Sequence, residues 1–166
     1  MKKLHATLVV AVIVSLLIGV GALAGGPARP SLPGSMPEEI FESTLIGSTP
    51  NMPIRGIASA GAAWVVAEGE IELLSDGTVD FEVEGLLLTS TGTVGPVTGV
   101  RVALTCEGTT GAVATTSVTP LDANGNAELK EQVTLPTSCL APIFLIRIGQ
   151  LNAGPINGPY IAASGF

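Results

Sequence analysis

Apolar and polar residues alternate along much of this sequence from Ile54 to the C-terminus. In the stretch VRVALTC, which begins at Val100, every second residue is apolar and falls on one face of an extended chain. The residues between them, Arg101, Ala103 and Thr105, fall on the other face. A period of two predicts strands with one buried face and one solvated face, which is typical of antiparallel sheets.

Turn sequences such as SDG, EGTTG and DANGN divide this region into short extended segments. The expected strands are Ile54–Ala60, Trp64–Leu74, Thr78–Leu88, Val100–Glu107, Ala112–Val118, Ala127–Leu135, Ile143–Ile148 and Tyr160–Ser164. Short strands with regular turns predict an all-β domain over residues 54–166, an antiparallel β-sandwich of immunoglobulin-like architecture whose strand topology stays open.

The segment EGEIELLSDGTVDFEVEG, from Glu68 to Gly85, predicts an acidic hairpin. Placing Leu73 opposite Val79 on the core face requires the three-residue loop 75–77, with glycine in the left-handed position. The solvated face then carries three rungs of facing carboxylates: Glu68 with Glu84, Glu70 with Glu82, and Glu72 with Asp80.

These six carboxylates need an explanation, because like charges directly opposite one another destabilise a pair of strands. One interpretation is a solvated face that keeps an exported protein soluble. A second is a neighbouring strand that supplies Arg101, Lys130 or Arg147 as a partner. A third is bound Ca²⁺, a cation that prefers several oxygen ligands; it is the one cofactor that the sequence suggests.

The N-terminus indicates export. Lys2 and Lys3 precede the largely apolar stretch Ala6–Ala24, which ends in small residues, so residues 1–24 are expected to be a signal peptide cleaved after Ala24. An uncleaved membrane anchor is the alternative, because the stretch is just long enough to span a bilayer. Both interpretations place the rest of the chain in the periplasm, on the cell surface or outside the cell; the absence of a nearby Cys excludes a bacterial lipoprotein.

Residues 25–53 are expected to form a tether, since Gly25–Pro37 is rich in Pro and Gly. A capping box begins at Ser35, and the apolar residues that follow, Phe41 and Leu45 among them, fit one stripe of a short helix. The alternative for this stretch is an extended lead-in to the first strand.

The only two cysteines, Cys106 and Cys139, are expected to form a disulfide in an exported protein. Closing a loop of 33 residues stabilises a fold by about 3 to 4 kcal/mol on the chain-entropy model. The alternative, a Cys–Cys metal site, would need further ligands, and the only histidine, His5, lies within the signal. Its position there also excludes Ser–His–Asp and Cys–His catalysis in the mature chain.

Cleavage after Ala24 removes two cations, so the formal charge changes from −7 to −9. Such a surface repels nucleic acid and anionic lipid and suits cations or basic partners. The expected partner is thus an extracellular ligand or protein of unknown identity, with membrane contact only if the signal is retained.

Two further motifs carry charged residues in suggestive positions. The segment Asp122–Val133 begins like a calcium loop, but its glycine falls too early and its twelfth residue is not Glu, so Asn124-Gly125 is better interpreted as a two-residue hairpin turn. Glu131 and Arg147 interrupt two core-facing patterns with opposite charges, which predicts a structural ion pair between them.

Three blocks, PIRGIASAGAAWVVAEGEIELLSDGTVDFEVEGLLL, VTGVRVALTC and TLPTSCLAPIFLIRIG, together with a closing YIAASG, resemble an uncharacterised family of small secreted bacterial proteins. The resemblance implies a β-sandwich over Pro53–Phe166 and brings no catalytic residues. The chain lacks the Trp that true immunoglobulin domains place between their two cysteines, because Trp64 precedes both Cys106 and Cys139.

The expected function is therefore a secreted, non-catalytic β-sandwich module with a binding or surface-structural role. One alternative is a Ca²⁺-binding extracellular module that uses the acidic hairpin. The other is a secreted hydrolase that works with two carboxylates.

Overall fold

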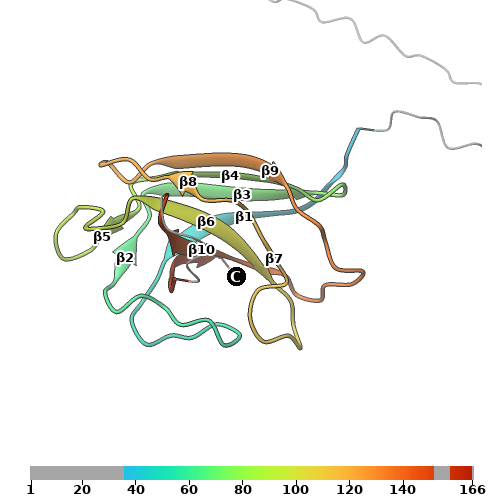
Figure 1. The fold of residues 1–166 in the computed structure, drawn as a ribbon, viewed down its shortest axis with the longest axis horizontal. Helices are drawn as coiled ribbons and strands as arrows, with labels where there is room; N and C mark the ends of the chain where they lie inside the picture. The colour runs from blue at the N-terminus through green and yellow to red at the C-terminus, as the bar shows by residue number, and fades with distance from the viewer. Residues whose placement is uncertain (1–35, 152–157, 166) are drawn as a thin grey trace, which may run out of the picture. The chain divides into compact units, whose positions relative to one another are not determined.

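The computed structural model describes residues 36–151 and 158–165, and within them the protein is all-β and antiparallel (Figure 1). The predicted signal peptide and residues 25–35 of the predicted tether lie outside the described residues. The strands are β1 (Glu39–Gly47), β2 (Trp64–Val65), β3 (Glu68–Leu74), β4 (Thr78–Glu84), β5 (Leu87–Leu88), β6 (Gly99–Thr105), β7 (Ala114–Thr115), β8 (Thr119–Pro120), β9 (Ala127–Gln132), β10 (Ile143–Gly149) and β11 (Tyr160–Ser164).

One strand connects the two halves of the main sheet. The order is β7-β6-β10-β11-β1-β3-β4-β9, with β8 also paired to β6, and a separate small ladder joins β2 to β5. The first part of β1 pairs with β3, and its last residues, Leu45 to Gly47, pair with β11. The chain therefore forms one continuous curled sheet, where the sequence had suggested two separate sheets.

The short helix considered around Phe41 and Leu45 was wrong, because these residues lie in β1. Their spacing also suits a strand: both side chains pack against the core, whereas Glu42 and Thr44 are exposed. The alternative, an extended conformation, is confirmed. The compact unit begins at Met36, whereas the β domain was expected to begin at residue 54. Pairing with strands far away in sequence decided the conformation here.

The core lies inside the curl, where β3, β4 and β9 lie across β6 and β10 (Figure 1). Ile71 and Phe81 face inward from β3 and β4 and are at most 1% exposed, and Val102 and Phe144 meet them from β6 and β10. The rings of Phe41 and Phe144 lie 5.1 Å apart between centroids. The predicted alternation is confirmed for β3 and β4, since the polar neighbours of their inward residues point away from the curl.

The opposite face of β6 and β10 is also buried, which corrects the expectation of a solvated face there. Ala103 and Leu145 are fully buried and pack with Ile57. Ile57 belongs to the segment 54–60, predicted as a strand, which in fact makes only isolated bridges and covers this face as an irregular loop. Arg55 in this loop has a positive φ of 46°, a conformation that interrupts an extended strand.

The two ends of the curled sheet meet where β8 lies beside β9. Thr119 Oγ1 donates to the carbonyl oxygen of Glu128 at 2.9 Å, and the carboxylate of Glu131 accepts from the backbone N–H of Ser117 at 3.0 Å and also from its hydroxyl. Glu131 thus links β9 to the residues before β8, at the junction between the two ends of the sheet that we call the seam. The predicted Glu131–Arg147 ion pair is wrong, because Arg147 donates instead to the carbonyl oxygen of Gly158.

The predicted disulfide between Cys106 and Cys139 is present, with 5.0 Å between the two Cα atoms. It joins the end of β6 to the segment that precedes β10, so it ties neighbouring strands of one sheet and not two separate sheets. Arg55 reinforces the same junction by donating to the carbonyl oxygens of Thr105 and Ala141. A disulfide of this kind indicates an oxidising, extracytoplasmic environment.

Residues 36–151 and 158–165 contain no helix with the length and apolar character needed to cross a membrane.

Candidate functional site

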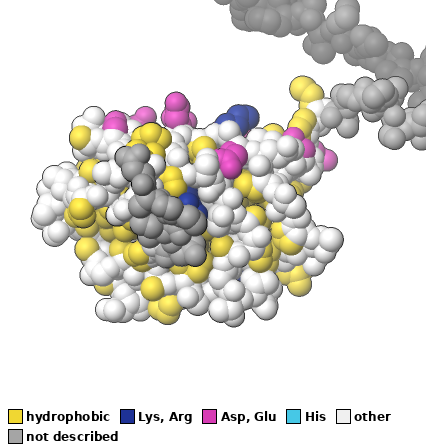
Figure 2. Space-filling model, viewed as in Figure 1, with side chains coloured by type: hydrophobic (Ala, Val, Ile, Leu, Met, Phe, Trp, Pro, Cys, Tyr) yellow, Lys and Arg dark blue, Asp and Glu magenta, His cyan; other side chains and the backbone are white. Residues whose placement is uncertain are grey.

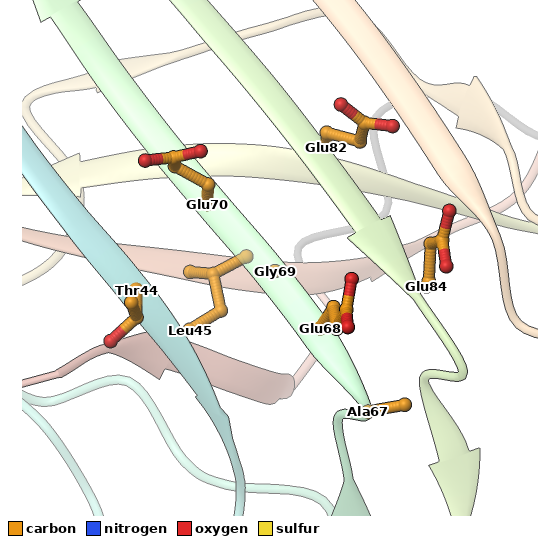
Figure 3. Close-up of a pocket in the computed structure, with 8 residues that line it drawn as sticks. All are labelled: Thr44, Leu45, Ala67, Glu68, Gly69, Glu70, Glu82 and Glu84. Atoms are coloured by element: carbon orange, nitrogen blue, oxygen red, sulfur yellow. The ribbon is translucent and has the colours of Figure 1, made fainter.

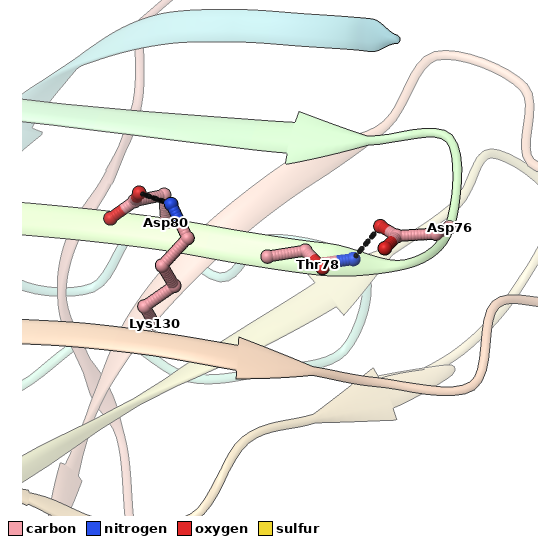
Figure 4. A network of polar contacts seen from close by, with 4 residues as sticks. All are labelled: Asp76, Thr78, Asp80 and Lys130. Carbon is pink, nitrogen blue, oxygen red and sulfur yellow. Dashed lines mark hydrogen bonds and ion pairs between the residues drawn. The ribbon is translucent and has the colours of Figure 1, made fainter. Parts of the chain in front are cut away.

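The acidic hairpin forms with the register that the sequence predicted. Glu68 pairs with Glu84, Glu70 with Glu82, and Glu72 with Asp80. The connection is the three-residue loop 75–77, in which Gly77 has a φ of +89°. Asp76 fixes this loop by accepting a hydrogen bond from the backbone N–H of Thr78 at 2.9 Å (Figure 4), and that bond lowers the pKa of Asp76.

Neighbouring strands widen the acidic surface on both sides. Glu42 of β1 lies opposite Glu72, and Glu128 of β9 lies opposite Glu82. Eight carboxylates therefore share one outer face of the sheet, which we call the acidic face: Glu42, Glu68, Glu70, Glu72, Asp80, Glu82, Glu84 and Glu128. Figure 2 shows acidic side chains projecting from the side of the molecule that carries β4 and β9.

One of the three cations proposed as partners does reach this face. Lys130 of β9 lies opposite Asp80 and donates to its carboxylate at 2.5 Å (Figure 4), which raises the pKa of Lys130. The two side chains are 65% and 39% exposed, so this ion pair adds little to stability. Arg101 and Arg147 occupy directly opposite positions on the neighbouring strands β6 and β10, in the other half of the sheet.

The row of carboxylates next to Asp80 and Lys130 on these strands has no cation among the described residues. Glu70, Glu82 and Glu128 occupy matching positions on β3, β4 and β9, and the one ion pair within residues 36–151 and 158–165 is Lys130–Asp80. A side-chain hydrogen bond with Glu42 raises the pKa of Glu70, and nearby carboxylate charges raise it further. The negative potential of this row is therefore uncompensated within the described part of the chain.

An open hollow lies at this end of the acidic face, with a volume of about 470 Å³ (Figure 3). Glu68, Glu70, Glu82 and Glu84 line it together with Leu45 and the backbone of Gly69. The carboxylates stand along the two strands and do not converge on one point (Figure 3). Such a surface suits several spaced positive charges better than one small ion.

The carboxylates of the acidic face are spread along its strands. Within the described residues, no group of three or more His, Cys, Asp or Glu side chains is arranged to hold a metal ion. The rungs run along the strands, so the backbone positions of successive rungs lie about 7 Å apart and the carboxylates are spread along the face. The acidic face can still attract cations through its summed charge.

The second calcium candidate is a structural turn, as expected, although its geometry differs from the prediction. The backbone N–H of Gly125 donates to the carbonyl oxygen of Asp122, and Gly125 has a φ of +83°, so the loop is three residues long, 123–125. The Asp122 carboxylate accepts from the backbone N–H of Asn126 at 2.9 Å, which lowers the pKa of Asp122. Its oxygens serve the turn rather than a metal.

The sequence predicted six members of the acidic face and missed two. Glu42 was missed because its segment was considered as a helix, and Glu128 because the order of the strands was open. Alternation within AELKEQ placed Glu128 and Lys130 on one face, but only the pairing of β9 with β4 shows that this face continues the hairpin.

No family model, curated protein or solved structure matches this chain. The fold and the acidic face define an antiparallel all-β domain with one disulfide and one strongly acidic surface.

Proposed function

We propose that this protein is an exported, non-catalytic module of the β-sandwich class that binds a cationic partner through the acidic face. The observation that carries the proposal is the row Glu70–Glu82–Glu128, three carboxylates side by side on adjacent strands without a cation from the described chain. A fold tolerates such a row more readily when a partner neutralises it, because like charges directly opposite destabilise strand pairs.

The spacing of the acidic face favours an extended basic peptide segment. Neighbouring strands lie about 4.8 Å apart, and residues on one face of a strand repeat about every 6.8 Å. An extended peptide with Lys or Arg at every second position presents its charges with the same repeat of about 6.8 Å. We therefore propose that the partner is a basic segment of another extracytoplasmic protein, drawn to this face by long-range electrostatic attraction.

Ca²⁺ is the alternative ligand of this face, because carboxylate oxygens are its preferred ligands. A hydrolase that uses two carboxylates is the other alternative, and the raised pKa of Glu70 is the feature that favours it. That pKa is raised on an exposed face, first by a hydrogen bond with Glu42, and not in a cleft that excludes water. The geometry thus supports binding better than catalysis.

The test measures binding of a fluorescent ten-residue peptide with alternating Lys and Thr by anisotropy. We expect Glu70→Gln/Glu82→Gln to weaken binding at least tenfold at low salt. The control variant Glu38→Gln/Glu107→Gln removes the same charge from exposed positions outside the acidic face and should change affinity much less. A peptide of the same composition with its Lys residues contiguous should bind more weakly than the alternating one.

Equal weakening in both double variants would show that net charge, and not the acidic face, attracts the peptide. Absence of peptide binding, combined with a stabilisation by millimolar Ca²⁺ that exceeds a NaCl control of equal ionic strength, would replace the proposal with the calcium alternative.

A further inference from the structure

Two arginines lie directly opposite each other in the middle of the sheet. Arg101 of β6 pairs with Arg147 of β10, and both belong to the face that also carries Ala103 and Leu145, away from the main core. Arg147 is only 7% exposed and Arg101 is partly buried. Facing like charges destabilise a strand pair even on a wet surface, and burial increases that cost.

The chain provides no side-chain carboxylate for either arginine. All fourteen Asp and Glu residues lie between positions 38 and 131, which the structure describes in full. The one ion pair that the described residues form is Lys130–Asp80. Two guanidinium groups thus share a partly buried position in a strongly acidic protein without an acidic partner from its side chains.

Several donors of these arginines are free among the described residues. Each guanidinium has five N–H donors. Arg147 uses Nε to donate to the carbonyl oxygen of Gly158 at 2.8 Å, and the Nε of Arg101 is buried without a hydrogen-bond partner. Burial lowers the pKa of Arg147, and the charge of Arg101 lowers it further, yet arginine stays protonated in proteins.

Arg55 shows how this fold satisfies an arginine that has only a structural role. Its Nη1 donates to the carbonyl oxygen and the hydroxyl of Thr105 at 2.7 and 3.1 Å, and its Nη2 donates to the carbonyl oxygen of Ala141 at 2.6 Å. Both terminal nitrogens are engaged by the protein itself. The pair Arg101–Arg147 has one such acceptor among the described residues, the carbonyl oxygen of Gly158, for two guanidinium groups.

We propose that Arg101 and Arg147 form a binding site for a dianionic phosphate group, either inorganic phosphate or a phosphate monoester. Two guanidinium forks match the oxygens of phosphate in geometry, and their combined charge of about +2 matches a phosphate dianion. Arg101 is the more exposed of the two and is therefore the arginine that an anion from solvent would meet first. This site is independent of the acidic face, since it lies in the other half of the sheet.

The experiment uses the exported full chain and measures thermal unfolding against inorganic phosphate at pH 7.5, with NaCl at equal ionic strength as the reference. We expect phosphate to raise the midpoint temperature beyond the NaCl reference, and Arg101→Gln to weaken phosphate binding at least tenfold. Lys130→Gln removes one cation from the acidic face and should leave the phosphate response unchanged. ³¹P line broadening provides a direct measure of binding in the same samples.

Glycerol phosphate in place of inorganic phosphate distinguishes the two sources of the group: stabilisation by both indicates a site open to monoesters, and stabilisation by inorganic phosphate alone indicates an enclosed site. Either result supports the proposal. A wild-type protein that responds to phosphate no more than to NaCl would overturn it, whether or not the arginine variants fold. An unchanged response in Arg101→Gln would overturn it as well.

Discussion

Removing the disulfide should destabilise this protein severely. The double variant Cys106→Ala/Cys139→Ala opens a loop closed across a sequence separation of 33 residues. The chain-entropy relation gives about 3.7 kcal/mol for a loop of that size at 25 °C. Domains of this length have total stabilities of about 5 to 15 kcal/mol, so the variant should lose a large fraction of its folding free energy.

The structure locates where this loss acts. Cys106 is 3% exposed and packs with the main core at the end of β6. The bond from Glu107 N–H to the Leu140 carbonyl oxygen, at 2.7 Å, and the bonds of Arg55 hold the same junction. These polar contacts should keep the folded state native-like in the variant, so that the effect falls mainly on the unfolded chain.

Urea unfolding provides the assay, followed through the fluorescence of Trp64, the only tryptophan, which is 5% exposed. We expect the free energy of unfolding to fall by about 3 to 4 kcal/mol and the midpoint temperature to fall by about 10 to 15 °C. Wild-type protein treated with a reductant should behave like the variant. The mass of the non-reduced mature protein should be two hydrogens below that of the reduced form.

A loss of less than about 1 kcal/mol would refute this reasoning, since it would show that the unfolded chain is already restricted without the disulfide. So would two freely alkylated thiols in protein isolated from the exported fraction.

Three further outcomes follow from the polar contacts. Glu131→Ala removes the acceptor of the Ser117 N–H at the seam and should cost about 1 kcal/mol in urea unfolding, whereas no change would show that the seam closes without it. The pKa of Asp122 is lowered on folding, so its contribution to stability is present above the ordinary value of 3.8 and disappears as the pH falls through the lower folded value; Asp122→Asn should therefore show a smaller loss of stability between pH 5 and pH 2. Glu70→Gln/Glu82→Gln should raise the midpoint temperature at low salt and lose that gain at high salt, because it removes one like-charge rung.

The parts of the fold predicted correctly are those that neighbouring residues determine. The register of the acidic hairpin follows from parity alone, because only a three-residue loop places Leu73 and Val79 on the same face. The inward positions of β6 follow from the same alternation. Both predictions needed no knowledge of distant strands.

The parts predicted incorrectly depend on distant pairing. The spacing of Phe41 and Leu45 fits a helix stripe as well as a strand, and pairing with β3 and β11 decides for the strand. The segment around Ile57 alternates like a strand, but it packs over β10 and β11 as an irregular cover. For the same reason the sequence placed Arg147 with Glu131, although strand order places it beside Arg101.

The curl of one sheet separates the charges of this protein. The outer faces of β3, β4 and β9 carry seven of its fourteen side-chain carboxylates, whereas β6 and β10 present two adjacent arginines on the face away from the main core. Within one continuous sheet these two surfaces cannot neutralise each other, because β1 and β11 lie between them. We therefore propose a counter-charge from elsewhere for each surface, a cationic partner for one and an oxyanion for the other. Because the two surfaces share no residue, a variant of one should leave binding at the other intact, which makes each proposal testable in the presence of the other.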